Sequence, residues 1–276
     1  MALRFSKMHG AGNDFVLVDA RAGPSFLDAA LARRMADRHT GVGFDQLLSI
    51  EASDLPGCVA RYRIWNSDGS PAQQCGNGAR CVAAWLVREG AAVAPRFRLA
   101  SPAGPIDVEC LPDGRFALDM GRPEFDPAKI PLQAGAQQPD YPAHLDGPML
   151  RFGAASIGNP HAVIVVDDLD LAPVAVLGPA LQAAGLFPEG VNVGFAQVVS
   201  PTQVRLRVHE RGAGETLACG SGACAAVAVL VRQGRLQRQA DVHLPGGILS
   251  IDWPADDAPV RMAGPTTFVF EGEWLE

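Results

Sequence analysis

Two cysteines in glycine-rich stretches are the residues best suited to carry out chemistry. Residues 73–81 read QQCGNGARC and residues 217–224 read LACGSGAC, and an apolar segment follows each. A helix that begins at Cys75 or Cys219 would offer unpaired N–H groups and the positive end of its dipole, which hold a carboxylate and lower a thiol pKa. Two such thiols on opposite faces of one carbon can remove a proton and return another, which inverts that carbon.

The two stretches are copies within an internal repeat. A displacement of 144 residues aligns CGNGARCVAAWLVREG, which begins at Cys75, with CGSGACAAVAVLVRQG, which begins at Cys219. The same displacement aligns RYRIWN at 61–66 with RLRVHE at 205–210. A repeat of this length indicates two similarly folded halves rather than a solenoid. The remaining cysteines do not align with one another and are interpreted as core residues: Cys58, Cys81, Cys110 and Cys224.

Apolar patterning predicts the elements that must position the two cysteines. Segments 79–87 and 223–231 are apolar on nearly every face, so as helices they must be buried all round. Gly90 and Gly234 are normal stops for these helices. Short β-branched or alternating runs such as DFVLVD, RYRIW, HAVIVV and RLRVH indicate strands, and IDVECLPDGRFALDM indicates a hairpin around Pro-Asp-Gly.

An amphipathic helix is also predicted from Ser25 to His39, with Ser25 as its N-cap and Asp28 in the capping-box position.

The predicted fold class is α/β of the α+β type, with two pseudo-twofold-related domains that arise from the repeat. Each domain is expected to be a curled, mostly antiparallel sheet around a central buried helix, and the active site is expected in the cleft between them. The predicted domains are 1–121 and 122–264. The segment 265–276 contains PTTFVFEG, which has no counterpart after residue 123, so we expect it to complete the first domain.

Composition narrows the class of protein. The chain has 276 residues, 48% of them hydrophobic, which is enough for a sizeable core. A net charge of -7 argues against a surface that coats nucleic acid. The first residues do not resemble a signal peptide and no apolar run is long enough to cross a bilayer. We therefore expect a cytoplasmic protein with no membrane or nucleic-acid partner.

Three other interpretations of the cysteine stretches remain open at this point. A phosphate-binding loop is possible, but CGNGA lacks the lysine of a P-loop and the GxGxxG spacing. A metal site built from Cys75, Cys219 and His161 would have ligand spacing that fits no common pattern. In the third interpretation, Cys75 and Cys219 are ordinary buried residues of the core that match by coincidence. The expectation is an acid/base pair with no metal and no cofactor.

Several motifs together resemble the diaminopimelate epimerase family over essentially the full chain. The residues that carry the resemblance are KMHGAGNDF (7–15), GFDQ (43–46), NSDGS (66–70), CGNGARC (75–81), GNPHAV (158–163), VNVGF (191–195) and ERGAGETLACGSGACA (210–225). The resemblance implies a cofactor-independent isomerase that interconverts LL- and meso-2,6-diaminopimelate for lysine and peptidoglycan precursor synthesis. It also implies a homodimer.

The resemblance further implies roles for individual residues. Cys75 and Cys219 would be the acid/base pair, and His161 and Glu210 would tune their pKa values. Glu210 would also bind substrate, and Arg211 would pair with the distal carboxylate through its planar guanidinium. The reacting carboxylate would lie on the helix ends formed by Gly76, Asn77, Gly220 and Ser221. The pocket would be lined by Asn13, Gln46, Asn66, Asn159 and Asn192.

The chain departs from the family pattern at three positions. Gln73 stands where family members often have Glu, Phe44 replaces a small residue, and Ser221 replaces Thr but keeps the hydroxyl.

Three rival functions are considered. A proline or hydroxyproline epimerase also uses paired cysteines but needs no partner for a distal carboxylate, so Arg211 and the asparagines discriminate against it. A phenazine-type isomerase shares the duplicated fold but lacks the cysteine pair. A non-catalytic amino-acid-binding protein would tolerate Cys75→Ala.

Overall fold

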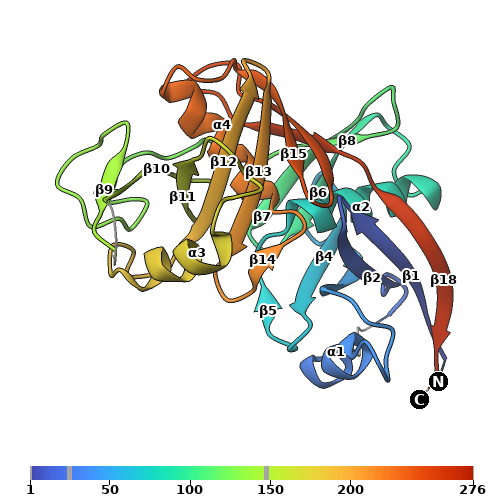
Figure 1. Cartoon of the computed structure of the whole chain (residues 1–276). Helices are drawn as coiled ribbons and strands as arrows, with labels where there is room; N and C mark the ends of the chain where they lie inside the picture. Colours follow the sequence, from blue (N-terminus) through green and yellow to red (C-terminus); the bar gives the residue numbers. More distant parts are fainter. Residues whose placement is uncertain (1, 24–26, 146–148, 276) are drawn as a thin grey trace. The chain divides into compact units, whose positions relative to one another are not determined.

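The computed structural model describes residues 2–23, 27–145 and 149–275 (Figure 1). The chain divides into two compact units. Unit 1 comprises Met1–Leu118 with Gly264–Glu276, and unit 2 comprises Asp119–Ala263. Each unit is described by itself below.

Unit 1 is a mixed sheet with two helices. Its elements are β1 (Leu3–Gly10), β2 (Asn13–Asp19), α1 (Ala29–Ala36), β3 (Gln46–Glu51), β4 (Cys58–Asn66), β5 (Pro71–Ala72), α2 (Gly76–Arg88), β6 (Arg96–Ser101), β7 (Gly104–Cys110), β8 (Phe116–Asp119) and β18 (Thr267–Trp274). β2 and β3 are parallel, as are β4 and β6, and the other paired neighbours are antiparallel. The hairpin predicted around Pro-Asp-Gly is formed by β7 and β8 and is therefore confirmed.

Unit 2 repeats this plan. Its elements are β9 (Tyr141–Ala143), β10 (Leu150–Ser156), β11 (Pro160–Val165), α3 (Val174–Ala183), β12 (Asn192–Ser200), β13 (Gln203–Glu210), β14 (Gly214–Thr216), α4 (Gly220–Arg232), β15 (Gln239–Leu244), β16 (Gly247–Asp252) and β17 (Arg261–Gly264). β11 and β12 are parallel, as are β13 and β15, and the other paired neighbours are antiparallel. The run from β10 to β16 therefore pairs in the same order as the run from β1 to β7, which confirms the predicted duplication.

Strand register makes the equivalence exact at the level of residues. Phe15 on β2 lies opposite Gln46 on β3, and His161 on β11 lies opposite Asn192 on β12. Counting from these pairs, Asn13 is equivalent to Asn159. The same positions of the two sheets therefore carry the polar residues that the sequence analysis selected.

Each unit wraps its strands around one buried helix. α2 contacts β1, β2, β3 and β6, and α4 contacts the strands from β10 to β13 together with β15 and β16. Both helices end at a glycine in the left-handed region, Gly90 with φ 68° and Gly234 with φ 70°. The N–H group of Gly90 donates to the Val87 carbonyl oxygen, and that of Gly234 donates to the Val231 carbonyl oxygen. The predicted central helices and their glycine stops are confirmed.

Helix α1 is shorter than the sequence predicted. It begins after Asp28, whose carboxylate accepts from Leu31 N at 2.8 Å, so Asp28 is the N-cap itself and not the capping-box residue. Ser25, the predicted cap, lies outside the described residues. The helix ends before Asp37, because the Asp37 carboxylate accepts from His39 N and Thr40 N and closes a turn instead.

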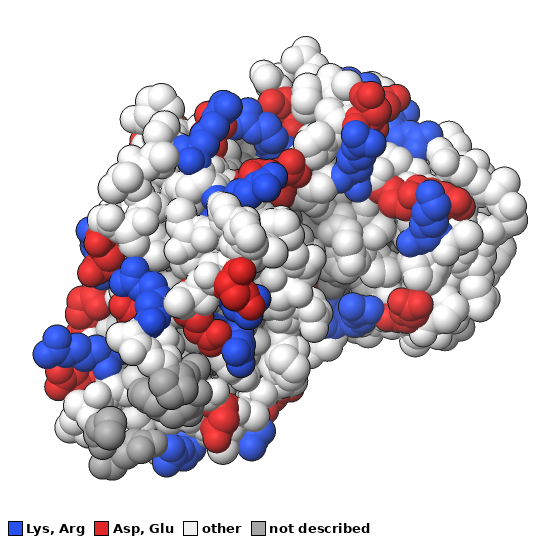
Figure 2. Space-filling view, turned by 180° about the vertical axis from the view of Figure 1, so that it is seen from behind, with Lys and Arg blue, Asp and Glu red and all other residues white. Residues whose placement is uncertain are grey.

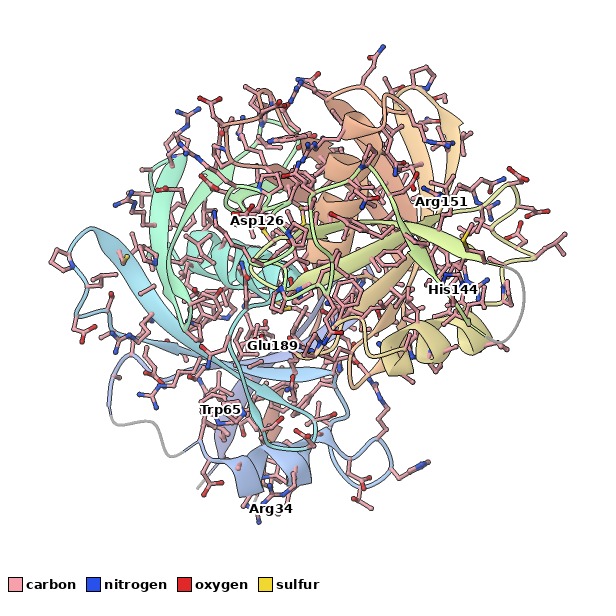
Figure 3. The ribbon with its side chains drawn as sticks, turned by 90° about the vertical axis from the view of Figure 1, so that its left-hand side faces the viewer. Arg34, Trp65, Asp126, His144, Arg151 and Glu189 are labelled. Carbon is pink, nitrogen blue, oxygen red and sulfur yellow. The ribbon has the colours of Figure 1, made fainter. Side chains whose placement is uncertain are left out.

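The inner face of α1 packs on the sheet of unit 1. Leu31, Met35 and Trp65 belong to one buried apolar cluster, which also contains Phe44. Figure 3 labels Trp65 on the sheet and Arg34 on α1, and Arg34 is exposed.

The edge of the unit 1 sheet is formed by a strand from far along the chain. β18 pairs with β1 over the whole of its length, from Leu3 opposite Trp274 to His9 opposite Thr267. Figure 1 shows β18 in red beside β1 in dark blue, with both chain ends nearby. In unit 2 the corresponding place beside β10 is taken by β9.

Charged side chains on the sheets are arranged in pairs. Arg98 lies 2.7 Å from Asp107 across β6 and β7, and Arg96 lies 3.0 Å from Glu109 on the same two strands. Figure 2 shows basic and acidic side chains interspersed over one face of the molecule. Within the described ranges, no helix is long and apolar enough to cross a membrane.

Candidate functional site

The candidate residues fall into two sets, one in each unit. We call the set in unit 1 the first half-site: Asn13, Gln46, Asn66, Cys75, Gly76 and Asn77. The second half-site in unit 2 consists of Asn159, His161, Asn192, Glu210, Arg211, Cys219, Gly220 and Ser221.

Cys75 is the N-cap of α2, and Gly76 is the first residue of that helix. Its sulfur accepts from Gly78 N at 3.3 Å, as a capping side chain does. The thiol lies 3.7 Å from Asn13 Oδ1, which also accepts from Asn77 Nδ2 at 3.4 Å. The structure thus brings Asn13, Cys75 and Asn77 together at a helix N-terminus, where a negative charge is stabilised.

Gln46 and Asn66 form a second contact of the first half-site. They lie opposite each other on β3 and β4, and Gln46 Nε2 donates to Asn66 Oδ1 at 3.0 Å. Asn66 Nδ2 donates in turn to Ser70 Oγ at 3.1 Å. The oxygen Gln46 Oε1 is buried and has no hydrogen-bond partner among the described residues. The pair therefore retains one acceptor that no described residue satisfies.

The sequence analysis missed Arg80, although it lies inside the CGNGAR motif. Arg80 is fully buried in α2, and its Nη2 donates to Asn77 Oδ1 at 2.7 Å. A Cβ at Gly10 would lie 3.3 Å from the Asn77 carbonyl oxygen and 3.5 Å from Arg80 Nη2, so β1 runs close to the start of α2. Arg80 orients Asn77 and adds a positive charge near the start of α2. The sequence signal that could have identified Arg80 is a basic residue in the same glycine-rich motif as Cys75.

Cys219 is the N-cap of α4 and is buried. Burial and the negative charge of Glu210 raise its pKa well above the ordinary value for a thiol. The Gly222 N–H and the Ser221 hydroxyl, whose oxygen lies 3.8 Å from the sulfur, act in the opposite direction but do not compensate. Cys219 is therefore a protonated thiol at neutral pH.

His161 is buried on β11 and lies at the centre of the second half-site. Its Nε2 lies 3.0 Å from Asn159 Oδ1 and 3.1 Å from Ser221 Oγ. Because an amide oxygen only accepts, Nε2 carries the proton. Burial and the charge of Arg211 lower the pKa of His161 to about 3, so the ring is neutral at physiological pH. The single Nε2–H group of His161 faces both Asn159 Oδ1 and Ser221 Oγ.

Three further residues of the second half-site lie close together: Glu210 ends β13, Arg211 follows it, and Asn192 begins β12. Glu210 accepts a hydrogen bond from Thr216 Oγ1, and Arg211 N donates to Asn192 Oδ1 at 2.9 Å. The exposed Arg211 guanidinium donates to the carbonyl oxygen of Glu189, a residue labelled in Figure 3.

Gly190 makes room for the Arg211 side chain. A Cβ at Gly190 would lie 2.6 Å from Arg211 Cδ, and the Gly190 backbone has φ +76°. The Arg211 stem is thus held across a glycine while its charged group remains accessible.

Two of the departures from the family pattern lie in different surroundings. Phe44 is buried in the apolar cluster under α1, and Gln73 is exposed. Phe44 therefore contributes to packing rather than to the polar residues of the first half-site. The six cysteines of the chain are all free thiols.

Comparison with known proteins places the chain in a family. The family model described as diaminopimelate epimerase matches residues 5–125 and 153–269, which include every motif of both half-sites. The chain belongs to the diaminopimelate epimerase family. The diaminopimelate epimerase of Xanthomonas axonopodis pv. citri (strain 306) is 59% identical over 273 residues, with 99% of this chain and 96% of that protein covered. That of Xylella fastidiosa (strain M12) is 55% identical over the same shares. This member of the diaminopimelate epimerase family is accordingly an isomerase.

Solved structures of other epimerases and isomerases share the fold of this diaminopimelate epimerase family member. A hydroxyproline epimerase from Agrobacterium vitis matches with a TM-score of 0.71 and 16% identity, over 99% of this chain and 92% of that one. A PhzF-family phenazine biosynthesis protein from Bacillus anthracis matches with a TM-score of 0.70 and 17% identity, over 100% of both chains. The predicted fold class is confirmed, and both rival families considered from the sequence have this fold.

Proposed function

We propose that the protein interconverts LL- and meso-2,6-diaminopimelate by proton transfer between the substrate α-carbon and two cysteine sulfurs. One observation carries the proposal: Cys75 and Cys219 are the N-caps of equivalent helices in the two copies of the repeat. The relatives named diaminopimelate epimerase, at 54–59% identity, support the choice of substrate. The proposed setting is the synthesis of lysine and peptidoglycan precursors.

The proposed reaction has two proton transfers. A thiolate takes the proton from the α-carbon, and the C–H electron pair passes into the adjacent carboxylate as negative charge. A thiol on the opposite face then gives its proton to the carbon and becomes the thiolate. In the direction in which Cys219 is the donor, its raised pKa keeps the required proton in place. Each proton moves between carbon and sulfur, so the scheme calls for no cofactor and no metal.

Substrate binding is proposed to use the polar groups around the two sulfurs. The helix ends at Gly76 and Gly220 would stabilise the charge that develops on the reacting carboxylate. The buried Gln46 Oε1 is an acceptor for the substrate ammonium group. Arg211, with its exposed guanidinium, is the proposed partner of the distal carboxylate.

Incubation with LL-diaminopimelate in deuterated water tests the proposal. The expected result is formation of the meso isomer with deuterium at the inverted α-carbon. Chiral chromatography measures the isomer ratio, and proton NMR measures the deuterium content. Cys75→Ala and Cys219→Ala are each expected to abolish the reaction, whereas Cys110→Ala, outside both half-sites, is the matched control.

Three results would overturn the proposal. They are near-wild-type turnover by either single cysteine variant, binding of diaminopimelate without exchange, and inversion of proline or hydroxyproline in its place. The second outcome would indicate an amino-acid-binding protein, and the third would indicate the rival epimerase.

A further inference from the structure

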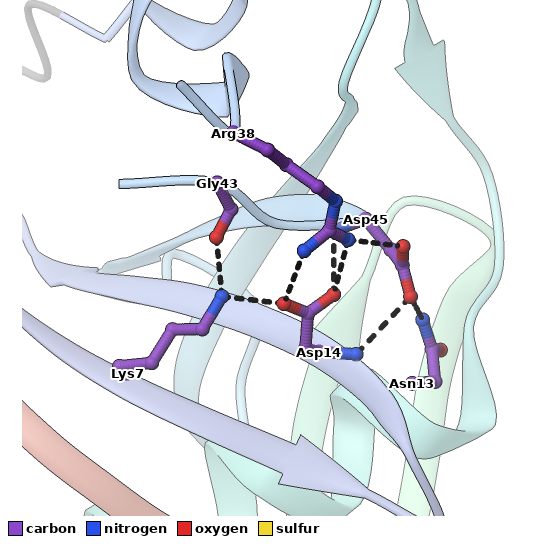
Figure 4. A network of polar contacts seen from close by, with 6 residues as sticks. All are labelled: Lys7, Asn13, Asp14, Arg38, Gly43 and Asp45. Carbon is purple, nitrogen blue, oxygen red and sulfur yellow. Dashed lines mark hydrogen bonds and ion pairs between the residues drawn. The ribbon is translucent and has the colours of Figure 1, made fainter. Parts of the chain in front are cut away.

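A cluster of four charged residues lies next to the first half-site (Figure 4). We call Lys7, Asp14, Arg38 and Asp45 the bracing cluster. The Lys7 ammonium group is almost fully buried, lies 2.5 Å from Asp14 Oδ2, and also donates to the Gly43 carbonyl oxygen. Arg38 Nη2 lies 3.0 Å from both Asp14 Oδ1 and Asp45 Oδ1, so one guanidinium joins the two carboxylates.

The Asp14 carboxylate is held in its ionised form by the two cations beside it. Burial alone would raise the pKa of Asp14, but the hydrogen bonds and charges of Arg38 and Lys7 together outweigh it and hold that pKa below its ordinary value. The Asp14 backbone is also fixed, since Asp45 N donates to both Asp14 O and Asp14 Oδ1. The start of β2 is therefore attached to the segment that leads into β3.

The bracing cluster contacts the first half-site through Asn13. Asp45 Oδ2 accepts from Asn13 Nδ2 at 2.8 Å and from Asp14 N at 3.2 Å. The oxygens of a carboxylate that pairs with Arg38 accept hydrogen bonds, so the amide nitrogen of Asn13 is the atom that faces Asp45. The amide oxygen consequently faces the other way, toward the Cys75 thiol at 3.7 Å and Asn77 Nδ2 at 3.4 Å.

The two-residue turn that precedes Asn13 has a strained backbone. Gly10 and Asn13 pair across a two-residue turn in which Ala11 has φ 51° and Gly12 has φ 83°. A left-handed conformation is unfavourable for a non-glycine residue, because its Cβ approaches the following carbonyl oxygen. Such strain persists where the surroundings fix the backbone, and the bracing cluster does so here.

The second half-site orients the equivalent asparagine differently. Pro160 and Val191 stand at the positions equivalent to Asp14 and Asp45, so they cannot provide carboxylates. Instead, His161 Nε2 holds Asn159 Oδ1, which leaves the NH2 group of Asn159 to face away from the ring. The Asn13 amide is thus held by its nitrogen and the Asn159 amide by its oxygen.

We propose that Asp45, held by Arg38, is a positioning residue that fixes the Asn13 amide with its oxygen toward the Cys75 thiol. The inference rests on the proposed function in one respect, namely that Cys75 exchanges a proton with substrate. In the fixed orientation Asn13 accepts the S–H hydrogen bond. In the reversed orientation it would present an N–H group to the sulfur beside the one that Gly78 already donates.

A double-mutant cycle between Asp45→Asn and Asn13→Ala tests the inference. Donors from Arg38, Asn13 and the Asp14 backbone converge on the Asp45 carboxylate, and an amide has one oxygen with which to replace two. Asp45→Asn is therefore expected to lower kcat/KM for diaminopimelate about tenfold or more. In the Asn13→Ala background the same change is expected to cost less than about twofold, because Asp45 acts through Asn13.

The control is Asp54→Asn, which removes the carboxylate of the exposed ion pair with Arg61 and is expected to leave kcat/KM unchanged. Equal losses from Asp45→Asn in both backgrounds would overturn the inference, since they would show that Asp45 acts on the fold and not through Asn13.

A second readout does not depend on turnover. Loss of the S–H acceptor is expected to speed the alkylation of Cys75 by iodoacetamide about fivefold in Asp45→Asn, measured by peptide mass mapping. Cys58, which is half-buried and remote from the first half-site, is the internal standard. An unchanged Cys75 rate would refute the inference. Faster alkylation in a protein that fails to epimerise diaminopimelate would support Asp45 as a positioning residue while refuting the proposed function.

Discussion

Replacement of Gly222 by alanine tests whether the Cys219 sulfur must occupy the position seen here. A Cβ at Gly222 would lie 3.1 Å from Cys219 Sγ, 3.2 Å from Cys219 Cβ and 3.3 Å from a methyl carbon of Val208. The equivalent change in the other copy of the repeat is Gly78→Ala. There the new Cβ would lie 3.3 Å from both Leu48 Cδ1 and Phe15 Cε1, and no sulfur is among its nearest atoms.

The two substitutions gain the same helix propensity and differ in what they displace. Glycine to alanine inside a helix contributes about 1 kcal/mol. Overpacking of the core by Gly78→Ala costs about 1–3 kcal/mol, so we expect a net loss near 1 kcal/mol and a Tm lower by about 2–4 °C. Gly222→Ala instead moves the sulfur by a few tenths of an ångström. Since a displacement of about 1 Å costs about a hundredfold in rate, kcat/KM should fall roughly tenfold.

The assay pairs thermal unfolding with epimerisation of diaminopimelate for both variants and the wild type. Gly222→Ala should lose activity as well as a similar amount of stability, whereas Gly78→Ala should lose mainly stability. The reasoning is refuted if Gly222→Ala retains full kcat/KM, or if Gly78→Ala loses activity to the same extent without any change in Tm.

Two further predictions concern pH and reactivity. Unfolded His161 binds a proton near pH 6.5 and the folded ring only near pH 3, so stability falls as the pH drops below 6.5; the loss is about 2 kcal/mol by pH 5. Urea unfolding at pH 7 and pH 5 should show that His161→Gln does not lose this stability. A pH dependence of stability identical to that of the wild type would contradict the prediction. Removal of the Glu210 charge should lower the Cys219 pKa, so Glu210→Gln should speed Cys219 alkylation at pH 8 at least threefold or so, and an unchanged rate would exclude that charge as a cause.

Much of the fold could be predicted from the sequence because the same pattern of elements occurs in both copies of the repeat. The apolar segments after Cys75 and Cys219 predicted buried helices, and the glycine stops were recognisable because the left-handed region favours that residue. The start of α1 was predicted wrongly because Ser25 and Asp28 are both good caps. The hydrogen bond from Leu31 N to its carboxylate identifies Asp28 as the cap.

The candidate residues were accessible to different degrees. Cys75 and Cys219 follow from the repeat alone, whereas the asparagines required the family resemblance, because Asn beside Gly is equally common in turns. Asp45 and Lys7 lay inside the recognised motifs and were still missed. They meet Asn13 only when β1, β2 and β3 pair, and no local pattern specifies that Arg38 will join two carboxylates.

The position of β18 late in the chain determines the order in which the two units can complete their sheets during translation. β1 emerges first and β18 emerges only after the whole of unit 2, so the sheet edge along Leu3–Gly10 must wait for residues translated much later. Unit 2 is continuous in sequence from Asp119 to Ala263 and needs no later segment to complete its sheet. The half of the chain that is made first is therefore the half that is finished last.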